Sequence, residues 1–129
     1  MDNLFIAATP SSPEVDFKFD QHRLSLRGES YPENAAAFYG DIIEQLRGYL
    51  ASCSRQQIAL HIALAYFNSS STKMLFNIIE ALNHAVETGN TVIVHWFHDE
   101  EDDTMLEFGQ DLRADFPAIE FITEAVKSG

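Results

Sequence analysis

The sequence predicts an α/β fold in which a mixed sheet of five to six strands with a parallel centre packs with three main helices. Three observations predict it. Period-two alternation indicates two strands near the N-terminus, helical periodicity recurs in two segments further on, and an almost continuously apolar run lies between those two segments. Strands that are joined through helices usually run parallel with right-handed connections, so we expect the centre of the sheet to be parallel.

The N-terminal part is expected to form a short strand, a loop over Thr9–Pro13 and a β-hairpin. Apolar residues at 15, 17 and 19 alternate with charged ones, and the alternation resumes over 24–28. The hairpin would turn at Asp20–Gln21. After it, Ser30 and Glu33 have the spacing of a capping box, with Pro32 in the first turn of a helix that runs from about Glu33 to Ser52.

The rest of the chain alternates strands and helices. Ile58–Phe67 is almost continuously apolar and predicts a central strand that is covered at least partly on both sides. Tyr66 falls on its face of large residues, whereas His61 falls on the face of small ones and is expected to be packed and hydrogen-bonded. The remaining elements are expected to be a helix through 74–86 that stops before Gly89, a strand over 91–97, a helix over 100–115 and a strand over 118–123.

Composition limits the classes of function. The 129 residues have 46% hydrophobic content, which suffices for one domain over residues 1–129 with a single core. A formal net charge of −12 disfavours nucleic acid and anionic membrane surfaces as partners. Cys53 is the single cysteine, so no disulfide framework is expected. With no apolar run near the roughly 20 residues of a membrane span, and no secretory signal pattern at the N-terminus, we expect a cytoplasmic protein.

The segment Asn68–Lys73 lies where the central strand ends and a helix begins. Unpaired N–H groups and the positive end of the helix dipole lie at such a point. A hydroxyl there can cap the helix, and a phosphate on that hydroxyl can be stabilised by the same N–H groups. The segment therefore suits a phosphorylation switch, although capping alone explains one of its polar residues. The pattern of a Gly-rich phosphate loop is missing.

The acidic run Asp99–Asp103 is the second candidate. Carboxylates can bind Mg²⁺ or Ca²⁺, but the EF-hand register fails because no glycine occupies its sixth position. Acidic residues are also typical of the first turn of a helix and of a solvated face. His95 and His98 lie nearby in sequence, which leaves a small metal-dependent hydrolase as an alternative. No zinc-site spacing or catalytic-triad pattern is present.

Three blocks of the sequence resemble the signature blocks of the SiaC family of bacterial regulatory phosphoproteins. They are Gly-Glu-Ser-Tyr-Pro-Glu-Asn at 28–34, Tyr-Phe-Asn-Ser-Ser-Ser-Thr-Lys at 66–73, and Trp-Phe-His-Asp at 96–99 followed by Asp102, Asp103, Met105, Glu107 and Gly109. The blocks occur in the order of the family, and the resemblance covers nearly the whole chain.

The resemblance implies a small STAS-like domain, similar to anti-sigma-factor antagonists, that is not an enzyme and needs no cofactor or metal. A kinase and a phosphatase of a partner-switching module would control it. SiaC-like proteins, when unphosphorylated, bind and activate a diguanylate cyclase, and so promote cyclic-di-GMP signalling and biofilm formation. A generic anti-sigma-factor antagonist is the alternative within this fold.

The resemblance also places the phosphoacceptor, because the family's hydroxyl residue directly follows the Asn of an Asn-Thr-Ser-Ser block. That position is Ser69, where serine stands in place of the usual threonine. Ser70, Ser71 and Thr72 stay open as substitutes. The partner-binding candidates are Tyr31, Pro32, Glu33, Asn34, Asn68, Ser70, Ser71, Trp96, Asp99, Asp102 and Asp103.

Overall fold

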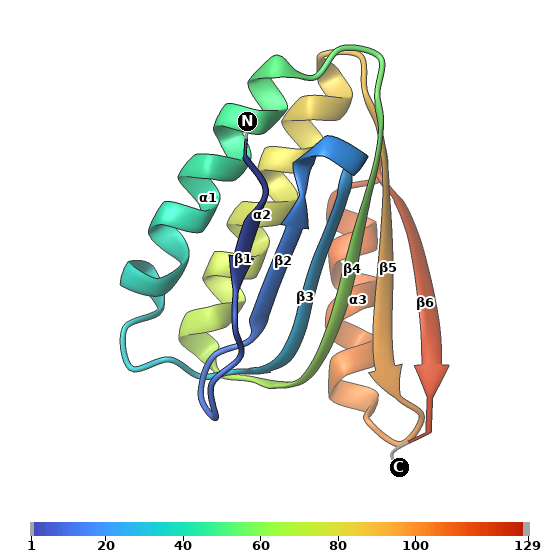
Figure 1. Ribbon diagram of the computed structural model, residues 1–129. Coiled ribbons are helices and arrows are strands. Elements are labelled where there is room, and N and C mark those ends of the chain that lie inside the picture. Colours follow the sequence, from blue (N-terminus) through green and yellow to red (C-terminus); the bar gives the residue numbers. More distant parts are fainter. Residues whose placement is uncertain (1, 128–129) are drawn as a thin grey trace.

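The computed structural model describes residues 2–127 and shows a six-stranded sheet whose strands follow one another in chain order (Figure 1). The strands β1 to β3 are antiparallel neighbours, and β3 to β6 are parallel ones. This confirms the predicted mixed sheet with a parallel centre and three main helices. The strands are β1 (Leu4–Ile6), β2 (Glu14–Lys18), β3 (Arg23–Ser30), β4 (Gln57–Phe67), β5 (Thr91–Asp99) and β6 (Glu120–Val126); the helices are α1 (Ala35–Ser52), α2 (Ser69–Glu87) and α3 (Asp103–Asp115), with a 3₁₀ turn, η1 (Phe19–Gln21), in the hairpin.

The three helices lie on one side of the sheet (Figure 1). Each connects a parallel strand to the next one along, and right-handed connections in the same direction put all of them on the same face. Leu60 and Leu64 of β4 are buried on that face, whereas His61 on the opposite face is half-buried. No helix among residues 2–127 covers the opposite face, so the expectation of cover on both sides of β4 is corrected. We call this opposite side the open face.

The core fills the space between the sheet and the helices. Trp96 of β5 is fully buried, and its Nε1 donates a hydrogen bond to the carbonyl oxygen of Met105 at 2.9 Å. Gly109 of α3 packs against the indole ring so closely that a Cβ there would lie 2.6 Å from Trp96 Cδ1. No described helix is both long and apolar enough to cross a lipid bilayer.

Strand β4 contains a β-bulge near its C-terminal end. Leu64 pairs with Gly28 and Tyr66 pairs with Glu29, so Ala65 is the extra residue. The bulge shifts the alternation of side chains by one position. Phe67 then faces the helices, where its ring lies 4.9 Å from that of Phe108, and Tyr66 is turned away from them and is 50% exposed. The placement of Tyr66 with the large buried residues was therefore wrong.

The start of α1 also differs from expectation. Its N-cap is Asn34, whose Oδ1 accepts a hydrogen bond from the Ala37 N–H at 3.0 Å. Ser30 does not form a capping box, because parallel pairing with Phe67 keeps it extended as the last residue of β3. Pro32 consequently precedes the helix instead of lying in its first turn. At the other end of the chain, pairing with β5 carries β6 to Val126, beyond the expected end at 123.

Candidate phosphorylation and partner site

The candidate site lies at the sheet edge where β3, β4 and β5 end. Each of these parallel strands is followed by the N-terminus of a helix, so three helix N-termini meet at one edge. Asn34, Asn68 and Asp102 are the N-caps, and each side chain accepts a hydrogen bond from the N–H three residues on, at 3.0, 2.9 and 3.0 Å respectively. Three of the predicted partner-binding residues therefore also have a structural role, because they cap the N-termini of the helices.

Ser69 is the first residue of α2 and its side chain is exposed. Because Asn68 is the cap, the Ser69 hydroxyl is not needed to hold the helix together. Ser69 and Ser70 line a hollow of about 410 Å³, together with Glu33, Asn34 and Lys73. Lys73 stands one helical turn after Ser69, on the same side of α2, so its ammonium group is within reach of a phosphate on Ser69.

Ser71, two residues further on, is fully buried in a chain of hydroxyl groups. The Ser30 hydroxyl donates to Ser71 Oγ at 2.8 Å, and Ser71 Oγ donates in turn to the Ser30 carbonyl oxygen at 3.0 Å. Since the Ser30 proton is used in this way, the Tyr39 hydroxyl is the donor in its 2.6 Å bond to Ser30 Oγ. Burial raises the pKa of Tyr39, an effect that the bond to Ser30 opposes in part, so the phenol stays protonated as this donor.

This network separates the hydroxyl groups of the block by accessibility. Ser71 offers a kinase no access in the folded protein, and the half-buried Thr72 donates its hydroxyl proton to the Asn68 carbonyl oxygen at 3.2 Å. Ser69 and Ser70 are left as the exposed candidates. The same bonds join the end of β3 to α1 and α2, so they fix the position of the α2 N-terminus relative to the rest of the edge.

The aromatic residues of the edge, together with Pro32, fall into an exposed group and a buried group. Tyr31 and Tyr66 are 39% and 50% exposed, and their rings meet edge-to-face with centroids 5.8 Å apart. Trp96 and Pro32 are buried, and their side chains offer a partner no surface in this conformation. Sequence reasoning missed Tyr66 as a surface residue, because simple alternation along β4 gives no sign of the bulge at Ala65.

The acidic run forms the turn between β5 and α3. Asp99 Oδ1 accepts a hydrogen bond from the Glu101 N–H at 2.8 Å, Asp102 caps α3, and Asp103 is exposed. A hollow of about 570 Å³ lies against these carboxylates and is also lined by Leu64 and Ala65. Among residues 2–127 no three His, Cys, Asp or Glu side chains are arranged to hold a metal ion. The metal-dependent hydrolase alternative therefore lacks a set of metal ligands in the described part of the chain.

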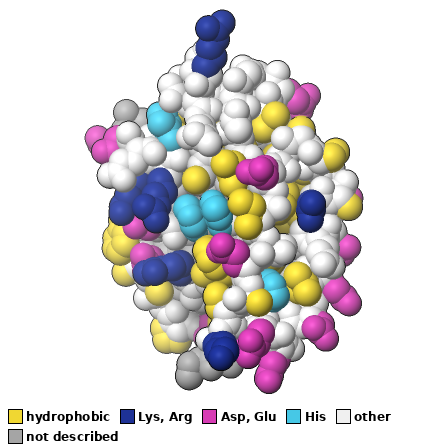
Figure 2. All heavy atoms as spheres, turned by 90° about the vertical axis from the view of Figure 1, so that its right-hand side faces the viewer, with side chains coloured by type: hydrophobic (Ala, Val, Ile, Leu, Met, Phe, Trp, Pro, Cys, Tyr) yellow, Lys and Arg dark blue, Asp and Glu magenta, His cyan; other side chains and the backbone are white. Residues whose placement is uncertain are grey.

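The histidines that the alternative needed lie elsewhere. His98 is buried, with Nδ1 3.0 Å from the Asp99 carbonyl oxygen, whereas His95 lies on the open face and stacks on His61 with centroids 4.5 Å apart. Figure 2 shows histidine side chains next to hydrophobic ones and to a group of Lys and Arg side chains. His61 Nδ1 is buried without a hydrogen-bond partner, while the ring has a backbone hydrogen bond at Leu24. The expectation of a packed, hydrogen-bonded histidine therefore holds in part.

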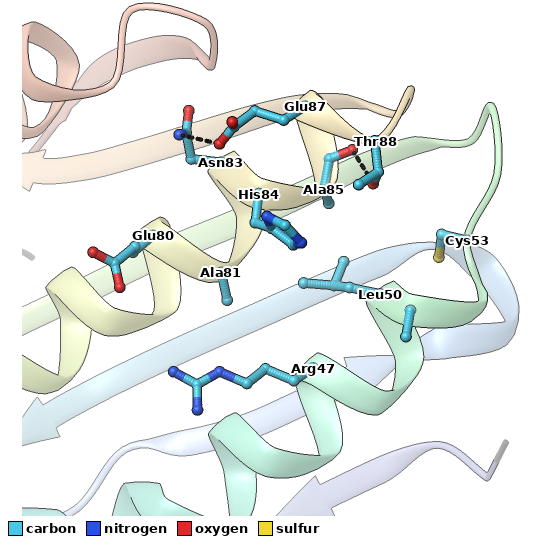
Figure 3. A pocket seen from close by; sticks show the side chains of 11 residues that line it. Arg47, Leu50, Cys53, Glu80, Ala81, Asn83, His84, Ala85, Glu87 and Thr88 are labelled. Atoms are coloured by element: carbon cyan, nitrogen blue, oxygen red, sulfur yellow. Dashed lines mark hydrogen bonds between the residues drawn. The ribbon is translucent and has the colours of Figure 1, made fainter.

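A larger groove, of about 590 Å³, lies between the C-terminal halves of α1 and α2 (Figure 3). Arg47 and Leu50 line it from α1, and Glu80, Ala81 and His84 line it from α2. The groove is near the end of α2 opposite to Ser69, and none of the predicted site residues borders it. It is therefore not part of the candidate site.

An exposed serine at the first position of a helix, on a sheet covered by helices on one face, is an arrangement suited to a small regulatory phosphoprotein. The model of the SiaC family of regulatory phosphoproteins matches residues 6–126. The chain belongs to this family, which confirms the resemblance seen in its sequence.

Solved structures of Pseudomonas aeruginosa proteins support the same assignment. A chain in the crystal structure of the diguanylate cyclase SiaD in complex with its activator SiaC superposes with a TM-score of 0.88 at 30% identity, covering 95% of this chain and 99% of that one. Apo-SiaC superposes with a TM-score of 0.81 at 28% identity, covering 97% and 100%. An uncharacterised protein of strain UCBPP-PA14 is 32% identical over 115 residues, which are 89% of this chain and 90% of that protein.

Proposed function

We propose that this chain is a non-enzymatic phospho-switch which, with Ser69 unmodified, binds and activates a diguanylate cyclase in the cytoplasm. It would thereby raise cyclic-di-GMP signalling and promote biofilm formation. The observation that carries the proposal is the exposed Ser69 at the start of α2, in a fold that matches SiaC from the complex with SiaD. A kinase and a phosphatase of a partner-switching module would add and remove the phosphate.

The surroundings of Ser69 explain how a phosphate would act. A phosphoserine carries about −1.5 to −2 charges, which the helix N-terminus and Lys73 can accommodate while the group is solvated. If a partner covers the exposed tyrosines next to Ser69, the phosphate lies within its footprint and has to lose its water. Removing a dianion from water is costly unless it is paired. The modified form would therefore stay folded but bind its partner weakly.

Substitutions at Ser69 test the proposal, with Ser70 as the matched control. Asn68 is the helix cap, so Ser69→Ala should change the free energy of unfolding by less than about 0.5 kcal/mol. Ser69→Asp places a negative charge at the helix N-terminus and should stabilise the fold by about 0.3–1 kcal/mol. The same Ser69→Asp variant should bind and activate the cyclase at least tenfold more weakly, whereas Ser69→Ala should remain active and resist the kinase.

The measurements are urea denaturation, binding to the diguanylate cyclase of the source organism, cyclic-di-GMP production and mass-spectrometric mapping of the phosphate. Ser70→Ala should still be phosphorylated and should bind normally. Phosphate mapped to Ser70, or a Ser69→Asp protein that binds as well as wild type, would contradict the assignment. Capture of an anti-sigma factor instead of a cyclase would favour the generic antagonist.

A further inference from the structure

We propose that Tyr66, turned outward by the β-bulge at Ala65, is the apolar anchor of the partner interface and receives a cyclase segment in which an apolar side chain is flanked by Lys or Arg. The inference rests on the proposed function and deepens it, because it names the surface and the chemistry of the segment that covers it. Tyr66 is absent from the residues that the sequence pattern pointed to as contacts.

The first argument is the exposure of an aromatic pair. The large side chains of β4 as far as Leu64 face the helices and are buried. Continued alternation would bury Tyr66 with them, yet Tyr66 is 50% exposed. Its ring packs edge-to-face on Tyr31, which is itself 39% exposed. Two tyrosines held against each other present a rigid apolar surface with little side-chain entropy left to lose, and tyrosine is enriched among the residues that dominate binding energy.

The second argument is the position of this pair beside Ser69. The Asn68 N–H donates a hydrogen bond to the Ser30 carbonyl oxygen at 3.0 Å, which ties the residue before Ser69 to the residue before Tyr31. Tyr66 itself precedes Ser69 by three positions. A partner that covers the two rings therefore reaches the start of α2, where the phosphate would be placed. β-Bulges are frequent next to functional sites, where they redirect a side chain.

The third argument is charge, and it selects the partner's chemistry. Glu29 is the pairing neighbour of Tyr66 across β3 and β4 and is exposed. The bulge residue Ala65 lines the hollow that Asp99, Glu101 and Asp103 border. One carboxylate thus lies beside Tyr66 and others border the hollow next to Ala65, in a chain whose net charge is −12. A basic segment is attracted to such a rim, and a second copy of this acidic chain is repelled by it.

The two tyrosine rings are the centre of this surface and the carboxylates are its rim, and the two parts contribute differently to binding. Solvated rim charges accelerate association and set its salt dependence but add little to affinity, whereas the desolvated centre supplies most of the binding energy. In this arrangement the Lys or Arg residues of the segment pair with the rim carboxylates. A phosphate on Ser69 then opposes binding, because it loses its water beside the two rings with no cation of the segment left to pair it.

The test measures binding between the full-length chain and the diguanylate cyclase of the source organism, by surface plasmon resonance at several salt concentrations. Tyr66→Ala should weaken the affinity at least tenfold, mainly through faster dissociation, and Tyr66→Phe should stay within threefold of wild type. Phe5→Ala is the matched control, because Phe5 is a 63% exposed aromatic residue on the edge strand β1. Glu29→Gln should slow association severalfold and lessen its dependence on salt.

The outcomes separate this inference from the proposed function. If wild type binds the cyclase and Tyr66→Ala binds within twofold of it, the anchor is refuted while the phospho-switch stands. If wild type does not bind the cyclase, both fall. If Tyr66→Ala changes self-association in analytical ultracentrifugation instead of cyclase binding, the surface joins copies of this chain and the inference is overturned. Tyr66→Phe keeps the ring, so it tests whether the ring or the hydroxyl group supplies the affinity, and urea denaturation of Tyr66→Ala shows whether that variant is folded.

Discussion

Replacing Gly109 by alanine is expected to destabilise the protein, although alanine is the better helix former. An added Cβ would lie 2.6 Å from Trp96 Cδ1, 2.7 Å from Nε1 and 2.9 Å from Cγ, distances at which the indole ring or α3 has to move. The ring cannot yield easily, because it is fully buried and its Nε1 is bonded to the Met105 carbonyl oxygen. Gly109 is thus needed for close packing of α3 on β5.

The magnitude follows from three opposing effects. Alanine is favoured over glycine in a helix by about 0.8–1 kcal/mol. Overpacking of a core costs about 1–3 kcal/mol, and a buried donor that loses its acceptor costs about 1–3 kcal/mol more. The sum for Gly109→Ala is a net loss of about 1–5 kcal/mol in the free energy of unfolding. Gly40 of α1 is the matched control, because a Cβ there meets nothing within 4 Å and Gly40→Ala should gain up to about 1 kcal/mol.

Urea denaturation of both variants measures this difference, and the intrinsic fluorescence of Trp96 follows the local change, since it is the single tryptophan of the chain. We expect the two alanine variants to lie on opposite sides of wild type. A Gly109→Ala protein as stable as Gly40→Ala, with an unchanged emission maximum, would refute the packing argument.

Two further predictions concern the caps and the open face. Asp102→Ala should lower the free energy of unfolding by about 0.5–2 kcal/mol because it removes the α3 cap, whereas Asp103→Ala, at an exposed position, should stay within about 0.5 kcal/mol of wild type in the same denaturation assay. Burial, then the neighbouring His95 and Arg23, hold the pKa of His61 below its usual range, while the Leu24 backbone and Glu124 oppose them. A lowered pKa in the folded state makes stability decline as the pH falls below about 6.5. His61→Phe should flatten this decline below pH 6.5; an identical slope in both proteins would argue against His61 as its source.

Much of the fold could be read from the sequence because it depends on local periodicity. The alternation along β2 and β3 and the helical spacing in α1 and α2 specify which residues face the core. The structure has the elements in the predicted order, with ends that differ by a few residues. The strand-to-helix turn at 68–73 was equally visible, so the location of the candidate phosphorylation segment followed from the sequence alone. The structure then showed that Asn68 is the cap and that α2 begins at Ser69.

The N-cap of α1 could not be identified from the local sequence alone. Ser30 and Asn34 are both residues that can precede a helix, and sequence spacing favoured Ser30. Pairing with Phe67, which lies 37 positions away in the chain, extends β3 through Ser30 and leaves Asn34 to cap α1. A long-range strand pairing thus decided a local structure, as it also did for the end of β6.

What the sequence by itself determined is the order of elements, the parallel centre of the sheet and a hydroxyl-rich segment at a strand-to-helix turn. The tertiary structure decided which hydroxyl groups of that segment are accessible. Ser71 is buried and hydrogen-bonded to Ser30, which lies 41 positions earlier in the chain, whereas Ser69 is exposed. It also decided that Tyr66 faces outward, through a bulge that arises only when β4 pairs with β3. The physical reason is that periodicity is a property of neighbours along the chain, whereas burial and register depend on contacts between distant segments.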